Sequence, residues 1–166
     1  MEGPYAIICI VLALAGATKI VSPLPTAQAL RGSGLPSTRG VVRGLGAAEL
    51  ALAVVGLTTG FVIVAVGVGF MYVGFAGFIV LALRKDSGIS CGCFGASSAE
   101  PTWGHVVLNV AAAGTALASA TVGPQALSDT LTDQPAYGLP FVGLALIGAV
   151  IMIALFTVLP ETLTHK

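Results

Sequence analysis

The residues of this chain with the clearest capacity for chemistry are the two cysteines of the stretch Cys91-Gly92-Cys93-Phe94-Gly95. One residue separates them, so both thiols project from one turn and can act on one partner atom. A disulfide needs Cα atoms within about 6.8 Å of each other, which residues two apart reach only in a compact turn of the kind that Gly92 permits. Such a bridge would be strained, and strain makes a disulfide more oxidising and more exchangeable. The spacing therefore indicates thiol–disulfide exchange, with soft-metal binding and a purely structural glycine turn as alternatives.

The surroundings of the pair favour exchange over metal binding. Arg84, Lys85 and the start of the following apolar segment favour a reactive thiolate. A zinc or copper shell would need further ligands, and only His105 lies nearby in the sequence. We therefore predict no metal site. The third cysteine, Cys9, lies among Ile and Val, where we expect it to pack as a small apolar side chain.

Composition assigns the chain to a class before any motif does. Hydrophobic residues make up 56% and charged residues 8% of the 166 residues, and the mean hydropathy is +1.00, whereas a soluble domain has roughly 25% charged residues. We therefore predict an integral membrane protein whose principal partner is the lipid bilayer. The net charge of zero argues against nucleic acid as a partner.

The distribution of apolar residues predicts an all-α, polytopic membrane helix bundle that forms a single domain over residues 1–166. Spans of about 20 residues cross a bilayer. The long apolar run after Leu45 is divided by Gly56-Leu57-Thr58-Thr59-Gly60, where we expect a tight hairpin. Residues 22–43, rich in proline and glycine, are expected to form an interfacial loop. The five predicted spans cover about residues 5–21, 43–58, 61–83, 103–121 and 139–159.

Positive charges predict the orientation in the membrane. All seven Lys and Arg residues lie at the end of the first span, in the first loop, in the cysteine loop or at the C-terminus. Five spans put these four regions on one side, which the positive-inside rule makes cytoplasmic. We therefore expect a multi-pass protein of the cell membrane with its N-terminus outside and both the cysteine loop and the C-terminus in the cytoplasm. The first span is expected to be retained, because Met1-Glu2-Gly3-Pro4 lacks the basic residues of a secretory signal.

Four polar residues should lie on the same membrane face as the cysteines and support them: Lys19, Glu49, His105 and Asn109. An ionisable group within a span costs about 2.5 to 3.5 kcal/mol on insertion scales, so Glu49 should face the bundle interior and find a partner. Lys19 is the natural candidate, unless it extends to the headgroups and Glu49 bonds locally. His105 and Asn109 are four residues apart and should share one helix face.

These residues also carry a family resemblance. The chain resembles the MauE and DoxX-like membrane proteins in its Gly16-Ala17-Thr18-Lys19 at the end of the first span and its Gly46-Ala47-Ala48-Glu49 at the start of the second. The turn from Cys91 to Gly95 before the fourth span is the most specific part of the match. Asn109 falls where the family tends to have an asparagine. The resemblance covers about residues 5–122, so the fifth span lies outside it, and His105 stands near a position where the family often has a basic residue.

The resemblance implies a four-helix, redox-associated membrane core. Its MauE branch implies a role in methylamine utilisation and in maturation of the disulfide-rich small subunit of methylamine dehydrogenase. Its DoxX branch implies a small subunit of a quinone-linked oxidoreductase complex.

Two functions from different classes follow. In the first, Cys91 and Cys93 are catalytic in a membrane thiol–disulfide oxidoreductase that exchanges electrons between a thioredoxin-like protein and a membrane acceptor such as quinone. In the second, the protein is a non-catalytic membrane scaffold whose cysteine loop docks a partner. No cofactor other than quinone is suggested by the sequence.

Overall fold

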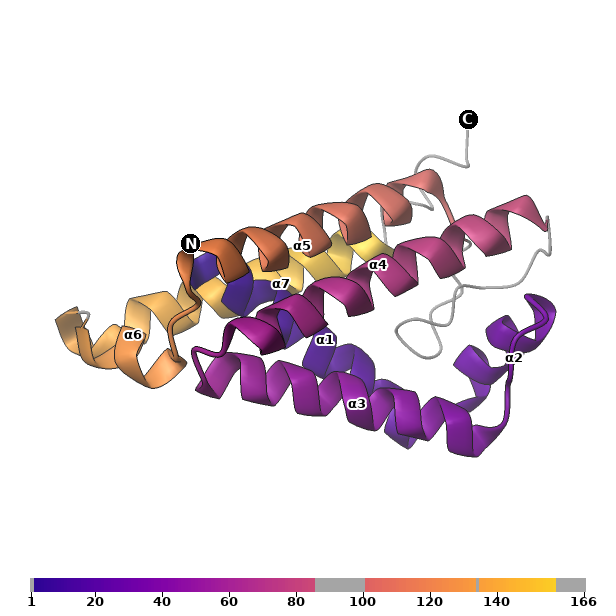
Figure 1. Cartoon of the computed structure of the whole chain (residues 1–166), viewed down its shortest axis with the longest axis horizontal. Helices are drawn as coiled ribbons and strands as arrows, with labels where there is room; N and C mark the ends of the chain where they lie inside the picture. The colour runs from indigo at the N-terminus through magenta and orange to yellow at the C-terminus, as the bar shows by residue number, and fades with distance from the viewer. Residues whose placement is uncertain (1, 86–100, 134, 158–166) are drawn as a thin grey trace.

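The computed structural model describes residues 2–85, 101–133 and 135–157, and within these ranges it contains helices and no strand. It confirms the predicted all-α membrane bundle (Figure 1). The helices are α1 (Glu2–Val21), α2 (Leu24–Gly32), α3 (Arg39–Thr58), α4 (Val62–Arg84), α5 (Trp103–Val122), α6 (Leu127–Asp133), the 3₁₀ helix η1 (Pro135–Gly138) and α7 (Leu139–Thr157).

Five of these helices, α1, α3, α4, α5 and α7, are long and apolar enough to cross a membrane. Helices suit that environment because their backbone hydrogen bonds are made within the segment, and lipid offers no alternative partner. The five run back and forth along the long axis of the molecule, so that α2 lies at one end and α6 at the other (Figure 1). The predicted spans thus correspond to observed helices.

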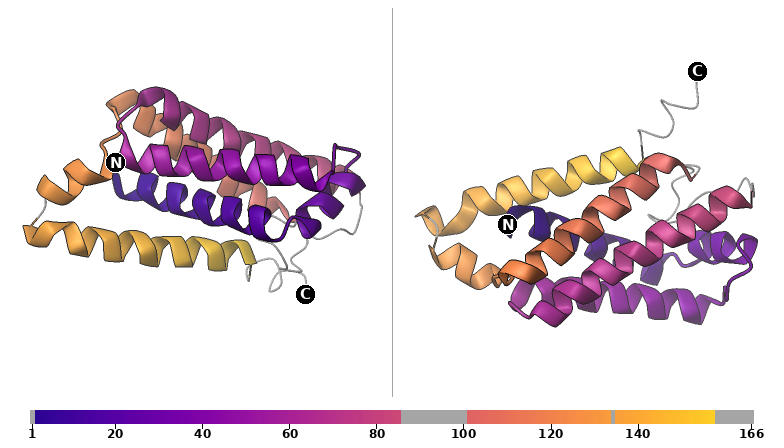
Figure 2. Two further views of the ribbon diagram at one scale, coloured as in Figure 1. Left: turned by 90° about the horizontal axis from the view of Figure 1, so that it is seen from below. Right: turned by 45° about the horizontal axis from the view of Figure 1, so that its top comes forward.

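The bundle is built from two tightly packed helix pairs. Helix α1 packs along α3, and α4 packs along α5. Buried side chains of the two pairs meet in one core that includes Leu12, Val68 and Ala112. Helix α7 packs mainly against α1, on the side away from α3, so that α1 lies between these two helices (Figure 2).

Helices α3 and α4 diverge from the short hairpin that joins them. They are close at residues 58–62 and separate toward the other end of the molecule, where α2 lies near the opening (Figure 1). The Lys85 ammonium donates a 2.6 Å hydrogen bond to the Ser33 carbonyl, which ties the residue after α2 to the residue after α4.

Both predicted connections contain more regular structure than expected. The segment expected to be an interfacial loop forms α2, which begins with proline in its first turn, and α3 starts at Arg39 with the Thr38 hydroxyl accepting from the Val41 amide. The connection before the last span contains α6 and η1. Short amphipathic segments of this kind give weak periodicity over so few residues, which is why the sequence did not predict them in full.

Charge is divided between the two ends of the bundle. Every lysine and arginine among the described residues lies in α2, in the adjoining parts of α1 and α3, or at the end of α4. Asp129 and Asp133 lie on α6 at the opposite end.

Candidate functional site

Helices α1 and α3 cross in close contact at Gly16 and Gly46. A Cβ on Gly16 would lie 2.6 Å from the Gly46 carbonyl oxygen, and a Cβ on Gly46 would lie 2.7 Å from the Gly16 carbonyl oxygen. No side chain fits at either distance, so both positions require glycine. Close backbone approach at small residues is a common basis of helix association in membranes.

The glycine crossing places two charged side chains against each other. Gly16 lies against Glu49, and Gly46 lies against Lys19, so each glycine accommodates the charged residue of the opposite helix. The Lys19 ammonium donates a 2.8 Å hydrogen bond to Glu49 Oε2, and both side chains are buried. The ion pair predicted from the sequence is therefore present.

The ion pair is not fully satisfied on the carboxylate side. Lys19 also contacts the Ala15 carbonyl at 3.4 Å, and its ammonium lies 5.2 Å from the centre of the Phe75 ring. Glu49 Oε1 has no hydrogen-bond partner among the described residues although it is buried. The two buried charges compensate each other only when α1 and α3 pack so that the side chains meet. The pair therefore favours one relative position of the two helices.

His105 is engaged at both ring nitrogens. Its Nε2 lies 2.8 Å from the Phe156 carbonyl oxygen at the end of α7, and Nδ1 accepts from the Thr102 amide at 3.2 Å. A carbonyl only accepts, so the ring carries its proton on Nε2. The Thr102 hydroxyl lies 2.9 Å from Nδ1. These contacts make His105 a link between the start of α5 and the end of α7.

Asn109 lies one turn after His105 on the same buried face of α5, as the spacing predicted. Its Nδ2 donates a 2.7 Å hydrogen bond to the His105 carbonyl. Across the bundle, the Tyr72 hydroxyl donates a 2.7 Å hydrogen bond to the Ile8 carbonyl and joins α4 to α1. Tyr72 was not singled out from the sequence, because an aromatic residue in an apolar span is ordinarily part of the core.

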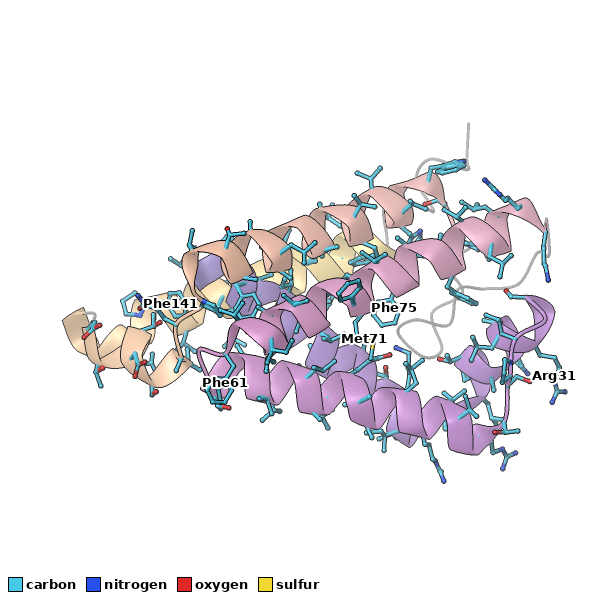
Figure 3. All side chains as sticks on the ribbon, in the orientation of Figure 1. Arg31, Phe61, Met71, Phe75 and Phe141 are labelled. Atoms are coloured by element: carbon cyan, nitrogen blue, oxygen red, sulfur yellow. The ribbon has the colours of Figure 1, made fainter. Side chains whose placement is uncertain are left out.

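A cavity of about 280 Å³ has Lys19, His105 and Asn109 in its lining. It is lined mainly by α1 and α4, with further residues from α2, α5, the start of α3 and the end of α7. Met71 and Phe75 are two of the α4 residues in this lining (Figure 3). Glu49, which pairs with Lys19, is not among the residues that line the cavity. The remainder of the lining is almost entirely apolar: Val11, Leu12, Ala15, Thr26, Leu30, Leu35, Leu45, Phe70, Met71, Tyr72, Gly74, Phe75, Phe78, Ile79 and Phe156. This cavity could not be predicted from the sequence, because it depends on the angle between helices.

Cys91 and Cys93, the predicted catalytic pair, lie outside the described residues. In the chain they follow α4 and precede α5. The third cysteine, Cys9, is fully buried in the core, in agreement with the packing role expected of it.

The fold and these contacts define a multi-pass membrane helix bundle whose first two long helices are joined by a buried lysine–glutamate pair. The chain belongs to the MauE family: the family model described as methylamine utilisation protein MauE matches residues 3–122. No curated protein and no solved structure matches the chain significantly.

The family match ends at the last residue of α5. Helices α1 to α5, with the glycine crossing, the ion pair and Asn109, lie within the match, and α6, η1 and α7 lie beyond it. The hydrogen bond between His105 and Phe156 therefore connects the family core to a helix outside that core.

Proposed function

We propose that this member of the MauE family carries out thiol–disulfide exchange in the membrane and that Cys91 and Cys93 are its exchanging pair. One observation supports the proposal above the others. The helices that flank the cysteine segment end at Arg84 and begin at Trp103, at the end of the bundle where α2 lies (Figure 1). Lys19 lies in the last turn of α1, and His105 and Asn109 lie in the first two turns of α5, at this same end. The chain therefore leaves α4 and enters α5 at this end of the bundle.

The proposed exchange needs no reactant other than the partner, because the electrons and protons that one protein loses are gained by the other. A thiolate of the partner attacks one sulfur of the Cys91–Cys93 bridge, and the mixed disulfide that forms is resolved by the second thiol of the partner. The bridge gains two electrons and two protons, and the partner loses them as its own disulfide forms. The same steps run in reverse when the partner is the oxidant. A small thioredoxin-like protein, which carries a dithiol on its surface, is the class of partner that this chemistry requires.

The four predicted supporting residues have different roles in the proposal. Lys19 and Glu49 hold α1 against α3 and so fix the first half of the bundle. His105 and Asn109 order the first turns of α5, which directly follow the cysteine segment in the chain. None of the four transfers electrons.

Thiol trapping of single-cysteine variants tests the function. We expect Cys91→Ser and Cys93→Ser each to leave a folded protein and to abolish exchange with a dithiol partner. When the partner is supplied in its oxidised form, Cys91 of the Cys93→Ser variant should accumulate a mixed disulfide with it, because in this direction Cys93 is the residue that would resolve the mixed disulfide. Cys9→Ala is the matched control: it removes a buried thiol and should leave exchange unchanged.

The double variant Cys91→Ser, Cys93→Ser is the one whose behaviour can contradict the exchange proposal. Full function of this variant in the native host would overturn the exchange proposal. It would favour the second function, a membrane scaffold in which the cysteine segment only docks a partner.

A further inference from the structure

The end of the bundle where α2 lies carries exposed positive charge that no carboxylate of the described residues balances. Within the described ranges one ion pair is present, and it joins the buried Lys19 to the buried Glu49. The sequence between α4 and α5 contributes two acidic residues, Asp86 and Glu100, so cations remain in excess at this end. The exposed cations are Arg31, Arg39, Arg43, Arg84 and Lys85.

Three of these cations border the connection between α2 and α3. Arg31 Nε donates a 3.4 Å hydrogen bond to the Ser37 hydroxyl. The Lys85 ammonium donates to the Ser33 carbonyl at the other end of the connection. Arg39 follows the connection directly as the first residue of α3. Cations from α2, from α3 and from the end of α4 are therefore brought to one short stretch of chain.

The arginines keep hydrogen-bond donors for a ligand. A guanidinium carries N–H donors on Nε and on both Nη atoms. Arg31 uses Nε for Ser37, and Arg43 uses Nε for the Ile20 carbonyl at 3.3 Å. These bonds fix the inner nitrogen, and the outer nitrogens form the fork that fits the oxygens of a phosphate group. Arg31 points away from the helix bundle (Figure 3).

Exposed apolar side chains lie among the cations in the same segments. Val21, the last residue of α1, is 82% exposed, and Leu24 and Val41 in the first turns of α2 and α3 are exposed as well. On α2, the exposed residues Leu24, Gln28 and Arg31 are spaced by four and three positions and so share one helix face. A surface of this kind fits the boundary between acyl chains and headgroups, where apolar side chains enter the hydrocarbon and cationic ones extend outward.

From these features we propose that the face formed by α2, the start of α3 and the end of α4 binds the headgroups of anionic phospholipids. Clusters of basic residues next to a membrane span are typical of such recognition. The phosphate group accepts from the arginine forks, and the acyl chains cover Val21 and Leu24. An acidic protein would balance the charge but not the exposed apolar side chains, whereas one lipid molecule satisfies both. This binding is independent of the cysteine chemistry.

Lipid selectivity of the reconstituted protein tests the proposal. The full-length protein in phosphatidylcholine bilayers would receive a trace of phosphatidylglycerol or of phosphatidylcholine, spin-labelled near the end of one acyl chain. Electron paramagnetic resonance then measures the fraction of each label that the protein immobilises. We expect phosphatidylglycerol to associate about fivefold more strongly at low salt, the effect of one basic residue at an anionic surface. Sodium chloride at about 1 M should remove most of this preference, because the Debye length falls to about 3 Å.

Matched variants locate the preference on the protein. The triple change Arg31→Gln, Arg39→Gln, Arg43→Gln should abolish it, whereas lysine at the same three positions keeps the charge and should retain most of it. Asp129→Asn with Asp133→Asn changes the charge of the opposite end and should have no effect. Helix content by circular dichroism controls for folding. Arg39→Gln alone breaks no side-chain hydrogen bond to a described residue and should lower the preference in part, which gives a second measurement if the triple variant does not fold.

Three results would overturn the proposal. Equal association of both labels with the wild type would favour docking of an acidic protein at this face. A preference that persists in the folded glutamine variant would place lipid selectivity elsewhere on the molecule. Inorganic phosphate that removes the preference more strongly than sodium chloride of equal ionic strength would favour a site for free phosphate, and an equal loss supports the headgroup. Thiol exchange is measured separately, so its failure leaves this inference intact.

Discussion

At the scale of single residues, two glycines and two charged side chains together form the contact between α1 and α3. Gly16 and Lys19 are three residues apart on α1, and Gly46 and Glu49 are three residues apart on α3. Each glycine removes the side chain that would keep the helices apart, and each charged residue packs against the glycine of the other helix. The ion pair is therefore buried because the backbones touch, and the repeated spacing in the two motifs has a geometric cause.

Gly46→Ala tests the contact between the backbones. The new Cβ would lie 2.7 Å from the Gly16 carbonyl oxygen and 2.9 Å from Lys19 Cβ, so α1 and α3 must separate. We expect a loss of about 1 to 3 kcal/mol in the free energy of unfolding in detergent. Gly44→Ala is the control on the same helix, because its Cβ meets no atom within 4 Å. It should be neutral or stabilising by up to about 1 kcal/mol, and equal losses in both variants would contradict the crossing.

Glu49→Gln tests the ion pair. The change keeps the size of the side chain and leaves the buried Lys19 charge uncompensated, so we expect a loss of about 3 kcal/mol in the free energy of unfolding. Lys19→Met in the same chain should recover part of it, by a coupling of about 0.5 to 3 kcal/mol in a double-mutant cycle. Asp129→Asn, which removes an exposed carboxylate on α6, should have little effect. Additive effects of the Lys19 and Glu49 changes would mean that the two residues do not stabilise each other.

At the scale of helices, the sequence predicted which segments span the membrane and left open how they pack. Apolar runs of sufficient length, with a glycine hairpin between two of them, were enough to predict five spanning helices. Pairing of Lys19 with Glu49 was also predictable, because an acidic side chain in an apolar span needs a partner. Periodicity does not reveal crossing angles, so neither the divergence of α3 from α4 nor the cavity followed from the sequence.

Helix α7 is the element for which the structure adds most to what the sequence predicted. It could be predicted as a span but not assigned a neighbour, because a segment apolar on every face gives no direction of packing. In the structure it packs on α1, and the Phe156 carbonyl at its end meets His105. Phe156 also lines the cavity, so the last helix completes a site that the family core otherwise forms.

His105→Ala tests the link between α5 and α7. The variant removes the contact with the Phe156 carbonyl, so amide hydrogen exchange in the last turn of α7 should accelerate. Thr102→Ala is the matched control, because it removes only the hydroxyl beside Nδ1 and leaves Nε2 in place. Mass spectrometry of the two variants would follow exchange in residues 150–157. Equal protection of α7 in His105→Ala and wild type would show that the contact between His105 and Phe156 does not hold the last helix in place.

At the scale of the whole molecule, the two ends of the bundle differ in charge. Lysine and arginine of the described chain gather at the end with α2, and Asp129 and Asp133 lie on α6 at the opposite end. An excess of positive charge in short loops is the main determinant of orientation in a membrane. The positive charges of the described chain lie at one end of the bundle, as the positive-inside rule requires. The rule predicts that this end, where α2 lies, faces the cytoplasm.

Cysteine labelling tests this orientation in intact cells. In a chain with Cys9, Cys91 and Cys93 replaced, a single cysteine would be introduced at Gly40, near the start of α3, or at Ser128, on α6; both positions are exposed. We expect a membrane-impermeant maleimide to label the cysteine at position 128 and not the cysteine at position 40, because positive charge keeps the α2 end inside. A permeant maleimide should label both, which controls for accessibility. The reverse pattern would put the cysteine segment on the outer face, where its exchange partner would be an exported protein.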